Sequence, residues 1–396
     1  MRIAKLEDIH ADGGWRKFSF LKLTTDEGLV GWAEYAENFG AGGVSELIQR
    51  FAGIVKGMDP RAVGRISASL HATTRLAAGG LNNQAIAAIE NACLDVKAKA
   101  LGIPVHSLFG GPVHDRLPVY WSHFGSFRMR FADFFEKEFG LPAIRTPEDV
   151  SQLAREARER GFKAVKTNPV FFGPEGGRMF DAGFRIAPGF LNRNITDGFI
   201  NASCQMLEAV RDGLGDDAGI MFDLNFSHRT EGLRRVAKAI EPYRLTWMEA
   251  DIHDPQALAL VRASSSTPIA SLESIHGLSA YRPYFEAASV DVAIIDVPWN
   301  GMLESYRIAT LADAFEVNVA PHNFYGDLAT LMSAHLCAAI PNFRILETEI
   351  DDVPWKSEFL THPPRIENGE LIVSDRPGWG SDINEEAVKA RPPRQR

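Results

Sequence analysis

The chain has 396 residues, of which 45% are hydrophobic and 23% are charged, an ordinary composition for a globular protein. This length suits two domains, or one large barrel with an appended domain, and a core of that size needs no disulfide staples. The 42 basic and 51 acidic residues give a formal net charge of -9. That balance argues against nucleic acids and membrane surfaces as partners, because both attract proteins with a basic face.

Three cysteines, Cys93, Cys204 and Cys337, lie far apart in the chain and in no paired spacing. They predict buried thiols in a reducing compartment rather than a disulfide framework or a zinc site. The first residues lack the apolar stretch of a signal peptide, and no segment is long and apolar enough to span a membrane. We therefore expect a cytoplasmic protein.

The first part of the chain has the pattern of a small α+β domain, which we place at residues 1–115. Three segments alternate like antiparallel strands, at residues 2–9, 18–28 and 29–35. Residues 82–102 then carry apolar side chains at helical spacing and end on a glycine, which predicts a helix.

Over residues 116–365, short apolar segments alternate with helical ones, as in parallel βαβ units. Eight strands are expected, at residues 118–124, 162–168, 219–226, 245–250, 268–273, 291–297, 317–323 and 344–349. Eight such units predict an α/β fold of the (β/α)8 TIM-barrel type. Residues 169–200 interrupt the rhythm, and we interpret them as a long loop of the functional or mobile kind.

Polar side chains recur where these strands end, at intervals of 26, 24, 23, 26 and 25 residues: Asp223, Glu249, Glu273, Asp296, His322 and Glu347. Since about 250 residues make eight barrel units, each interval is one unit, and each strand brings one polar group to the same rim. The end of a buried strand is a poor place for an unpaired acid. One or two such acids can be structural, but six polar groups in phase indicate a site.

The three acids Asp223, Glu249 and Glu273 come from consecutive strands. Carboxylates that lie close together repel one another unless a cation joins them, and hard oxygen ligands suit Mg²⁺ or Mn²⁺. The alternative is that each acid caps the helix after its strand. Their common phase favours the metal site.

The next two strands supply Asp296 and His322. A neighbouring aspartate fixes the tautomer of an imidazole and raises its basicity, which makes a competent general base. Strand alternation also places Lys166 and Asn168 on one face of residues 162–168, with Lys166 near the rim. A buried lysine needs an anionic partner, so Lys166 supplies the positive charge that an anionic ligand requires.

These residues resemble the enolase superfamily, in its mandelate racemase and muconate lactonizing enzyme branch. Besides the acid trio and the Asp–His pair, four segments are similar to the family, at residues 24–35, 85–111, 335–342 and 377–388. The resemblance implies an N-terminal capping domain, a modified (β/α) barrel, and a C-terminal segment, residues 366–396, that returns to the capping domain. It also implies a homo-oligomer, because relatives are commonly dimers or octamers.

The resemblance further implies Mg²⁺ on Asp223, Glu249 and Glu273, and a reaction that begins with removal of the proton α to a carboxylate. His322 with Asp296 would be the base, and the metal and Lys166 would stabilise the enediolate that forms. Asn225 and Glu347 match polar positions of the family's pocket and are expected to bind the substrate carboxylate or its metal-bound oxygen.

One departure from the family bears on the reaction. Many relatives carry Lys-x-Lys on the second barrel strand and use the second lysine as a base, whereas this chain has Asn168, which is not basic. Racemisation needs a base on each face of the substrate, but β-elimination of water needs one base and one acid. We therefore expect a dehydratase of a sugar acid, with His322 able to serve in both roles. The alternatives are a cycloisomerase or epimerase, and a degenerate barrel that binds a ligand without turnover.

The substrate pocket is expected to include further residues besides Asn168. His123 ends the first barrel strand, and Trp15 and Arg16 lie in the capping-domain loop that family members use for specificity. The arginines of the 169–200 loop either bind the substrate at the barrel mouth or pack against a neighbouring subunit: Arg178, Arg185 and Arg193.

Overall fold

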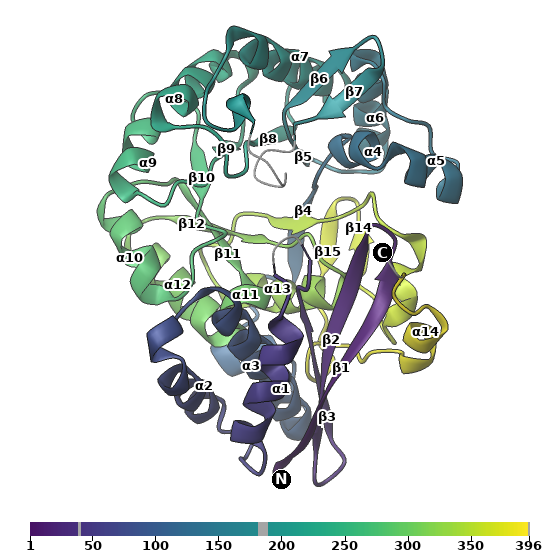
Figure 1. Cartoon of the computed structure of the whole chain (residues 1–396), viewed down its shortest axis with the longest axis vertical. Coiled ribbons are helices and arrows are strands. Elements are labelled where there is room, and N and C mark those ends of the chain that lie inside the picture. Colours follow the sequence, from purple (N-terminus) through teal and green to yellow (C-terminus); the bar gives the residue numbers. More distant parts are fainter. Residues whose placement is uncertain (39–40, 181–188, 395–396) are drawn as a thin grey trace.

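The computed structural model describes residues 1–38, 41–180 and 189–394. Figure 1 shows two parts, an N-terminal sheet with helices in purple and blue, and a larger ring of strands with helices on its outside. In the described part of the chain, no helix combines the length and apolar character that crossing a membrane requires.

The N-terminal part consists of one antiparallel sheet and three helices. The strands are β1 (Ile3–Gly13), β2 (Arg16–Thr25) and β3 (Val30–Tyr35), and the helices are α1 (Val44–Val55), α2 (Val63–Thr73) and α3 (Gly80–Leu101). The three predicted strands and the predicted helix are confirmed. Helix α3 ends at Gly102, whose φ of 69° lies in the left-handed region that favours glycine.

The larger part is a modified (β/α)8 barrel, as predicted. Its parallel strands are β4 (Arg116–Trp121), β5 (Ala164–Thr167), β8 (Gly219–Asp223), β9 (Trp247–Glu249), β10 (Ile269–Ser271), β11 (Val292–Asp296), β12 (Asn318–His322) and β13 (Leu346–Thr348). They are hydrogen-bonded in the order β12-β11-β10-β9-β8-β5-β4-β13. Closure follows from a bridge between Phe343, just before β13, and Val319 of β12.

Helices cover the outside of these strands (Figure 1). Buried side chains fill the inside. The outer helices are α6 (Pro147–Glu159), α7 (Asp197–Leu214), α8 (Thr230–Ala239), α9 (Pro255–Arg262), α10 (Leu278–Glu286), α12 (Met302–Ala314) and α13 (Asp327–Ala339). Buried Tyr120, Met221, Trp247 and Ile294 belong to one cluster of inward-facing residues. Because the barrel interior is packed, a ligand can bind only at a rim.

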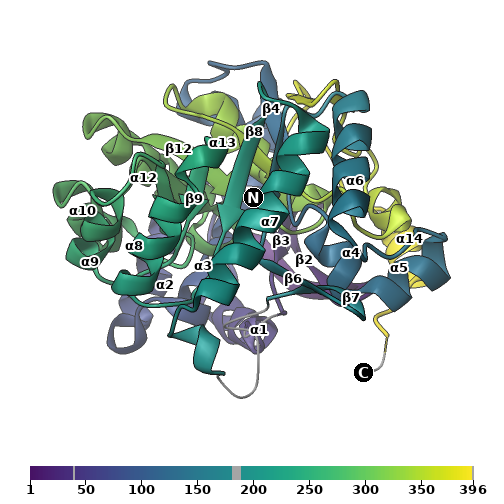
Figure 2. The same ribbon diagram turned by 90° about the horizontal axis from the view of Figure 1, so that it is seen from above.

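The segment expected to be a long loop contains regular structure. Residues Val170–Gly173 and Gly176–Met179 form a hairpin, β6 and β7, and α7 begins at Asp197. This hairpin lies beside α4 (Ser126–Arg130) in both views (Figures 1 and 2). Its strands are four residues each and rich in glycine, so their alternation is too short to read from sequence.

The C-terminal segment contacts both parts of the molecule. The strands β14 (Ile366–Glu367) and β15 (Glu370–Ile372) form a hairpin, and β15 pairs antiparallel with β4. Trp379 is fully buried, and its indole N–H donates to the carbonyl of Trp32 in β3 at 2.9 Å. The domain limits at residues 115 and 365 remain a prediction.

Candidate active site

A cavity of about 270 Å³ lies at the carboxyl ends of the barrel strands, where the N-terminal part covers them. The barrel contributes polar side chains to its wall: His123, Lys166, Asp223, Asn225, Glu273, His322 and Glu347. The N-terminal part contributes Asn38 and Gln84, among others. A concave site at this end of a barrel, with convergent polar groups, is where small-molecule ligands bind.

His322 and Asp296 form a buried pair at one side of this cavity. They are register partners on β12 and β11, and His322 Nδ1 lies 2.6 Å from Asp296 Oδ2. Asp296 also accepts hydrogen bonds from the Tyr325 hydroxyl at 2.6 Å and from the Trp299 backbone N–H at 2.7 Å. These hydrogen bonds fix the position of the Asp296 carboxylate. Because Asp296 contacts Nδ1 of His322, the other ring nitrogen, Nε2, is not bonded to Asp296.

The charge environment of His322 favours its protonated form. Burial by itself lowers the pKa of the imidazole, but the carboxylates of Glu273 and Asp296 raise it to about 10. Nε2 lies 3.6 Å from Glu273 Oε2, which is beyond a strong hydrogen bond. The two carboxylates therefore increase the affinity of this imidazole for a proton.

Lys166 lies among three carboxylates in the wall of the cavity. Its Nζ atom is 3.0 Å from Glu347, 3.2 Å from Glu249 and 3.6 Å from Asp223. Burial by itself lowers the pKa of Lys166, but these neighbours raise it well above the ordinary value. Lys166 is thus a fixed positive charge in the wall of the cavity.

The acids Asp223, Glu249 and Glu273 carry more negative charge than Lys166 balances. Asp223 and Glu249 are register partners on β8 and β9, and burial raises the pKa of all three carboxyls. Within the described residues, the Oε1 atom of Glu249 is buried without a hydrogen-bond partner. An unpaired buried carboxylate oxygen is costly. Carboxylate oxygens are the donors that a hard divalent cation such as Mg²⁺ prefers, so the chemistry of this donor set is compatible with such an ion.

Glu347 is a buried carboxylate with a full set of donors. Its Oε2 accepts the backbone N–H of Asn323 at 2.7 Å, and its Oε1 accepts the Ser122 hydroxyl and lies 3.0 Å from Lys166 Nζ. Although burial alone raises the pKa of Glu347, Lys166 and the nearby histidines lower it to about 2. It is therefore a permanent negative charge at the cavity.

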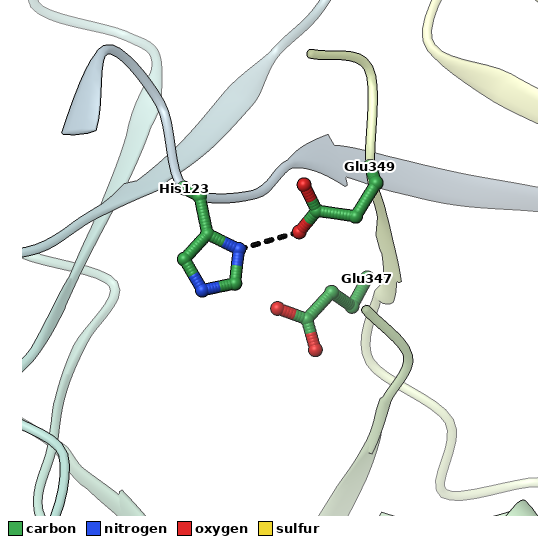
Figure 3. Close-up of side chains that lie close together, drawn as sticks. All are labelled: His123, Glu347 and Glu349. Atoms are coloured by element: carbon green, nitrogen blue, oxygen red, sulfur yellow. Dashed lines mark hydrogen bonds and ion pairs between the residues drawn. The ribbon is translucent and has the colours of Figure 1, made fainter. Parts of the chain in front are cut away.

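A second histidine–carboxylate pair lies close to Glu347. His123, after the end of β4, places Nδ1 2.5 Å from Oε1 of Glu349, just beyond β13 (Figure 3). Together with Glu347, these residues bring three ligand-type atoms within 4.8 Å of one another.

The residues expected to bind substrate fall into two groups. His123, Asn225 and Glu347 line the cavity, whereas Asn168 is not among the lining residues of the described chain. The Asn168 amide is engaged on both sides, because Oδ1 accepts the Ser126 hydroxyl at 2.8 Å and Nδ2 donates to the Asp223 carbonyl at 3.3 Å.

Trp15 and Arg16 lie behind the cavity wall rather than in it. Trp15 stacks on Phe131, with ring centroids 5.0 Å apart. Arg16 is buried, pairs with Asp352 and donates to the carbonyl of Phe324. Since the Phe324 ring lines the cavity, Arg16 is linked to the site through that residue.

Much of the cavity wall was not anticipated from sequence. It includes apolar and weakly polar side chains that follow the strand ends: Phe127, Phe226, Ser274, His276, Trp299 and Phe324. Their positions, one to four residues beyond each predicted strand-end group, are the signal that identifies them. Arg130 and Met179 also line it. Arg178 and Arg193 are exposed, and Arg185 lies outside the described residues.

Two family models match the sequence. Residues 14–110 match the mandelate racemase / muconate lactonizing enzyme N-terminal domain, and residues 149–387 match the enolase C-terminal domain-like family. The two matches span most of the N-terminal part and most of the barrel.

Named relatives cover almost the whole chain. A D-xylonate dehydratase from Haloferax volcanii is 29% identical, over 98% of this chain and 89% of its own length. A D-gluconate dehydratase from Thermoproteus tenax is 28% identical, over 97% and 72% respectively. Among solved structures, a candidate L-alanine-DL-glutamate epimerase from Burkholderia xenovorans strain LB400, bound to magnesium and fumarate, is 42% identical. It superposes with a TM-score of 0.95 over 99% of this chain and 96% of that one.

Proposed function

Because this chain belongs to the mandelate racemase and muconate lactonizing enzyme family, with an enolase-like barrel, we propose that it is a Mg²⁺-dependent dehydratase of a sugar acid. The observation that carries the proposal is the His322–Asp296 pair, with its Nδ1–Oδ2 distance of 2.6 Å, in the wall of a cavity that also holds Lys166. A basic imidazole beside a fixed positive charge suits removal of a proton next to a carboxylate.

In this mechanism the Nε2 atom of His322 takes the proton from the carbon α to the substrate carboxylate. Asp296 orients the ring through Nδ1 and stabilises the imidazolium that results. Lys166 stabilises the negative charge that develops on the substrate carboxylate. Asp223, Glu249 and Glu273 would hold Mg²⁺, which supplies further positive charge for the same carboxylate. Loss of the β-hydroxyl as water then gives an enol that becomes the 2-keto-3-deoxy acid.

The second barrel strand supports elimination over inversion of the α-carbon. At its end stands Asn168, an amide with no useful basicity, whose two polar atoms bond Ser126 and the Asp223 carbonyl. Lys166 is held by carboxylates that keep it protonated, so it is a poor base. This arrangement leaves His322 as the proton acceptor that the proposal uses.

Epimerisation is the second candidate, favoured by the name of the 42% identical structure from Burkholderia xenovorans. An epimerase exchanges the α-proton without losing water. Incubation with L-alanyl-L-glutamate and Mg²⁺, followed by chiral chromatography, tests this function. Formation of the D-glutamyl epimer, with no dehydration of any sugar acid, would replace the proposed function with this one.

The proposed function is tested with a panel of aldonic and aldaric acids that includes D-xylonate and D-gluconate. Purified protein with Mg²⁺ should convert at least one acid to a 2-keto-3-deoxy product, detected with a carbonyl reagent and identified by mass. His322→Asn should abolish this product. A complete panel without any keto acid would contradict the proposal, and calorimetric binding without turnover would instead indicate a ligand-binding barrel.

We further propose that the protein acts in the cytoplasm as a homo-oligomer. The support is the family resemblance together with three cysteines that form no disulfide. Light scattering of the purified protein measures the oligomer, and a monomer would contradict that part of the proposal.

A further inference from the structure

We propose that His123, held by Glu349, is a second proton-transfer residue, the general acid that protonates the departing β-hydroxyl of the substrate. This inference rests on the proposed dehydratase function and adds a role to it, because His322 then serves as the base. It assigns a catalytic function to the His123–Glu349 pair, whose residues follow β4 and β13, whereas His322 and Asp296 end β12 and β11.

The first support is that the two pairs are built alike. His123 Nδ1 lies 2.5 Å from Glu349 Oε1, and His322 Nδ1 lies 2.6 Å from Asp296 Oδ2. Both carboxylates are buried, with Glu349 only 3% exposed. A buried carboxylate on Nδ1 fixes the tautomer and leaves Nε2 for the substrate. In Figure 3 the second ring nitrogen of His123 points away from Glu349.

The second support is that the His123 ring is fixed where it faces the cavity. It stacks on Phe127 with a centroid distance of 3.8 Å and an interplanar angle of 15°, and both residues line the cavity. His123 also has a φ of 45°, in the left-handed region that side chains other than glycine adopt at a cost. Strained residues that are held in this way concentrate at active sites.

The two histidines face the same space. His123 follows β4 and His322 ends β12, and β13 lies between these two strands. The ring of Phe324 stands beside both, with centroids 6.3 Å from His123 and 5.0 Å from His322. A substrate in the cavity can therefore contact both imidazoles, one at the α-carbon and one at the β-hydroxyl.

A cation on His123, Glu347 and Glu349 explains the cluster less well. Glu347 already accepts hydrogen bonds from Ser122 and Asn323, and Lys166 Nζ is 3.0 Å away. The lysine charge opposes a second cation at that position. A proton-carrying imidazole, in contrast, needs only the Oε1 atom of Glu349, which already lies 2.5 Å from Nδ1.

His322 Nε2 forms a bond to the α-proton as the C–H bond breaks, and the electron pair of that bond moves into the carboxylate to give the enediolate. The pair then returns to form the α–β double bond as the β C–O bond breaks. His123 Nε2 gives its proton to the departing hydroxide, and water leaves. On ketonisation, His322 returns its proton to the β-carbon and the enol hydroxyl proton restores His123. The net change is loss of one water from the substrate.

The test compares His123→Asn and Glu349→Gln with wild type in the Mg²⁺-loaded enzyme, using the aldonate that wild type dehydrates. His123→Asn should lower the dehydration rate by about 10²- to 10⁴-fold, the usual contribution of a general acid. Glu349→Gln should lower it less, because the amide oxygen still accepts from Nδ1. His362→Asn, at an exposed histidine outside the cavity wall, is the matched control and should dehydrate at the wild-type rate.

A fluorinated substrate separates acid catalysis from substrate binding. In the 3-deoxy-3-fluoro analogue the leaving group is fluoride, which needs no proton. His123→Asn should release fluoride within about threefold of the wild-type rate, while it fails on the hydroxy acid. Equal losses on both substrates would overturn the acid role and leave His123 as a binding residue. Full dehydration by His123→Asn would also overturn it.

The failure of this inference differs from the failure of the proposed function. If wild type neither dehydrates any acid of the panel nor exchanges its α-proton with D₂O, the dehydratase function fails. If wild type dehydrates and His123→Asn does too, only the role of His123 fails. If circular dichroism shows that His123→Asn does not fold, the same comparison is made with Glu349→Gln. Wild-type rates of Glu349→Gln on both the hydroxy acid and the fluoro analogue would contradict the inference.

Discussion

Asp296 and His322 are register partners on neighbouring parallel strands, and a 2.6 Å contact joins Oδ2 of the first to Nδ1 of the second. Two separate strands thus deliver the pair, and the barrel itself sets its geometry. The orientation of the base therefore depends on the fold rather than on a flexible loop.

Asp296→Asn tests this dependence. The amide cannot stabilise the imidazolium and can present an N–H to Nδ1, so kcat should fall by about 10²- to 10⁴-fold with the fold intact. Steady-state kinetics on the aldonate that wild type dehydrates measures the loss. Tyr325→Phe is the matched control, because it removes one hydrogen bond to Asp296 and keeps the carboxylate. A smaller loss in Asp296→Asn than in Tyr325→Phe would contradict the orienting role.

Lys166→Met should abolish turnover but not metal binding. The substitution removes the ammonium group that lies 3.2 Å from Glu249. The net charge of the cluster of acids around this position therefore becomes more negative. We expect at least a thousandfold loss in kcat/KM, together with Mg²⁺ affinity equal to or higher than that of wild type. Isothermal titration with Mg²⁺ alone measures the affinity. Weaker Mg²⁺ binding would show that Lys166 helps to form the metal site.

Mg²⁺ should stabilise the protein, because the buried oxygen of Glu249 lacks a partner among the described residues. At a concentration of 100 times Kd, binding to the folded state adds about 2.7 kcal/mol to the free energy of unfolding. Glu249→Gln should remove most of this gain, whereas Glu286→Gln on the surface should keep it. Thermal unfolding with and without a chelator gives the comparison. An equal gain in Glu249→Gln would place the ion elsewhere.

Glu90, which lies in α3 and outside the active site, should make the stability of the protein depend on pH. Burial raises its pKa to about 7, although the Leu303 N–H donates to it at 3.0 Å. A raised pKa in the folded state stabilises the protein below the ordinary value of 4.5, and this contribution is lost as the pH rises through about 7. Between pH 5 and 8, the free energy of unfolding should fall by about 2 kcal/mol more in wild type than in Glu90→Gln. Urea unfolding at both pH values measures the difference, and parallel pH profiles would contradict it.

The periodicity of apolar residues in the sequence was sufficient to predict the fold. All eight barrel strands lie where short apolar runs were found, because burial on both faces leaves a continuous apolar segment of the right length. The β6–β7 hairpin was missed because four-residue strands with two adjacent glycines carry no readable period. Residues 181–188 of the expected loop lie outside the described part of the chain.

For the site, strand position identified which residues share a rim but not what each one contacts. Alternation placed Asn168 on the same face as Lys166, yet its amide is used by Ser126 and Asp223. Glu349 was overlooked, although it stands two residues after Glu347 and alternation puts both on one face. Its partnership with His123 depends on the pairing of β13 with β4, which no local pattern specifies.

Exchange of the substrate α-proton with D₂O shows whether His322 removes this proton. Wild type and His322→Asn, both loaded with Mg²⁺, are incubated with the aldonate and aldarate panel, and proton NMR follows the signal at the α-carbon. Wild type should exchange or eliminate this proton in at least one acid, and His322→Asn should do so at least a thousandfold more slowly. Exchange at the wild-type rate in His322→Asn would contradict the role of His322 and assign the base to another residue.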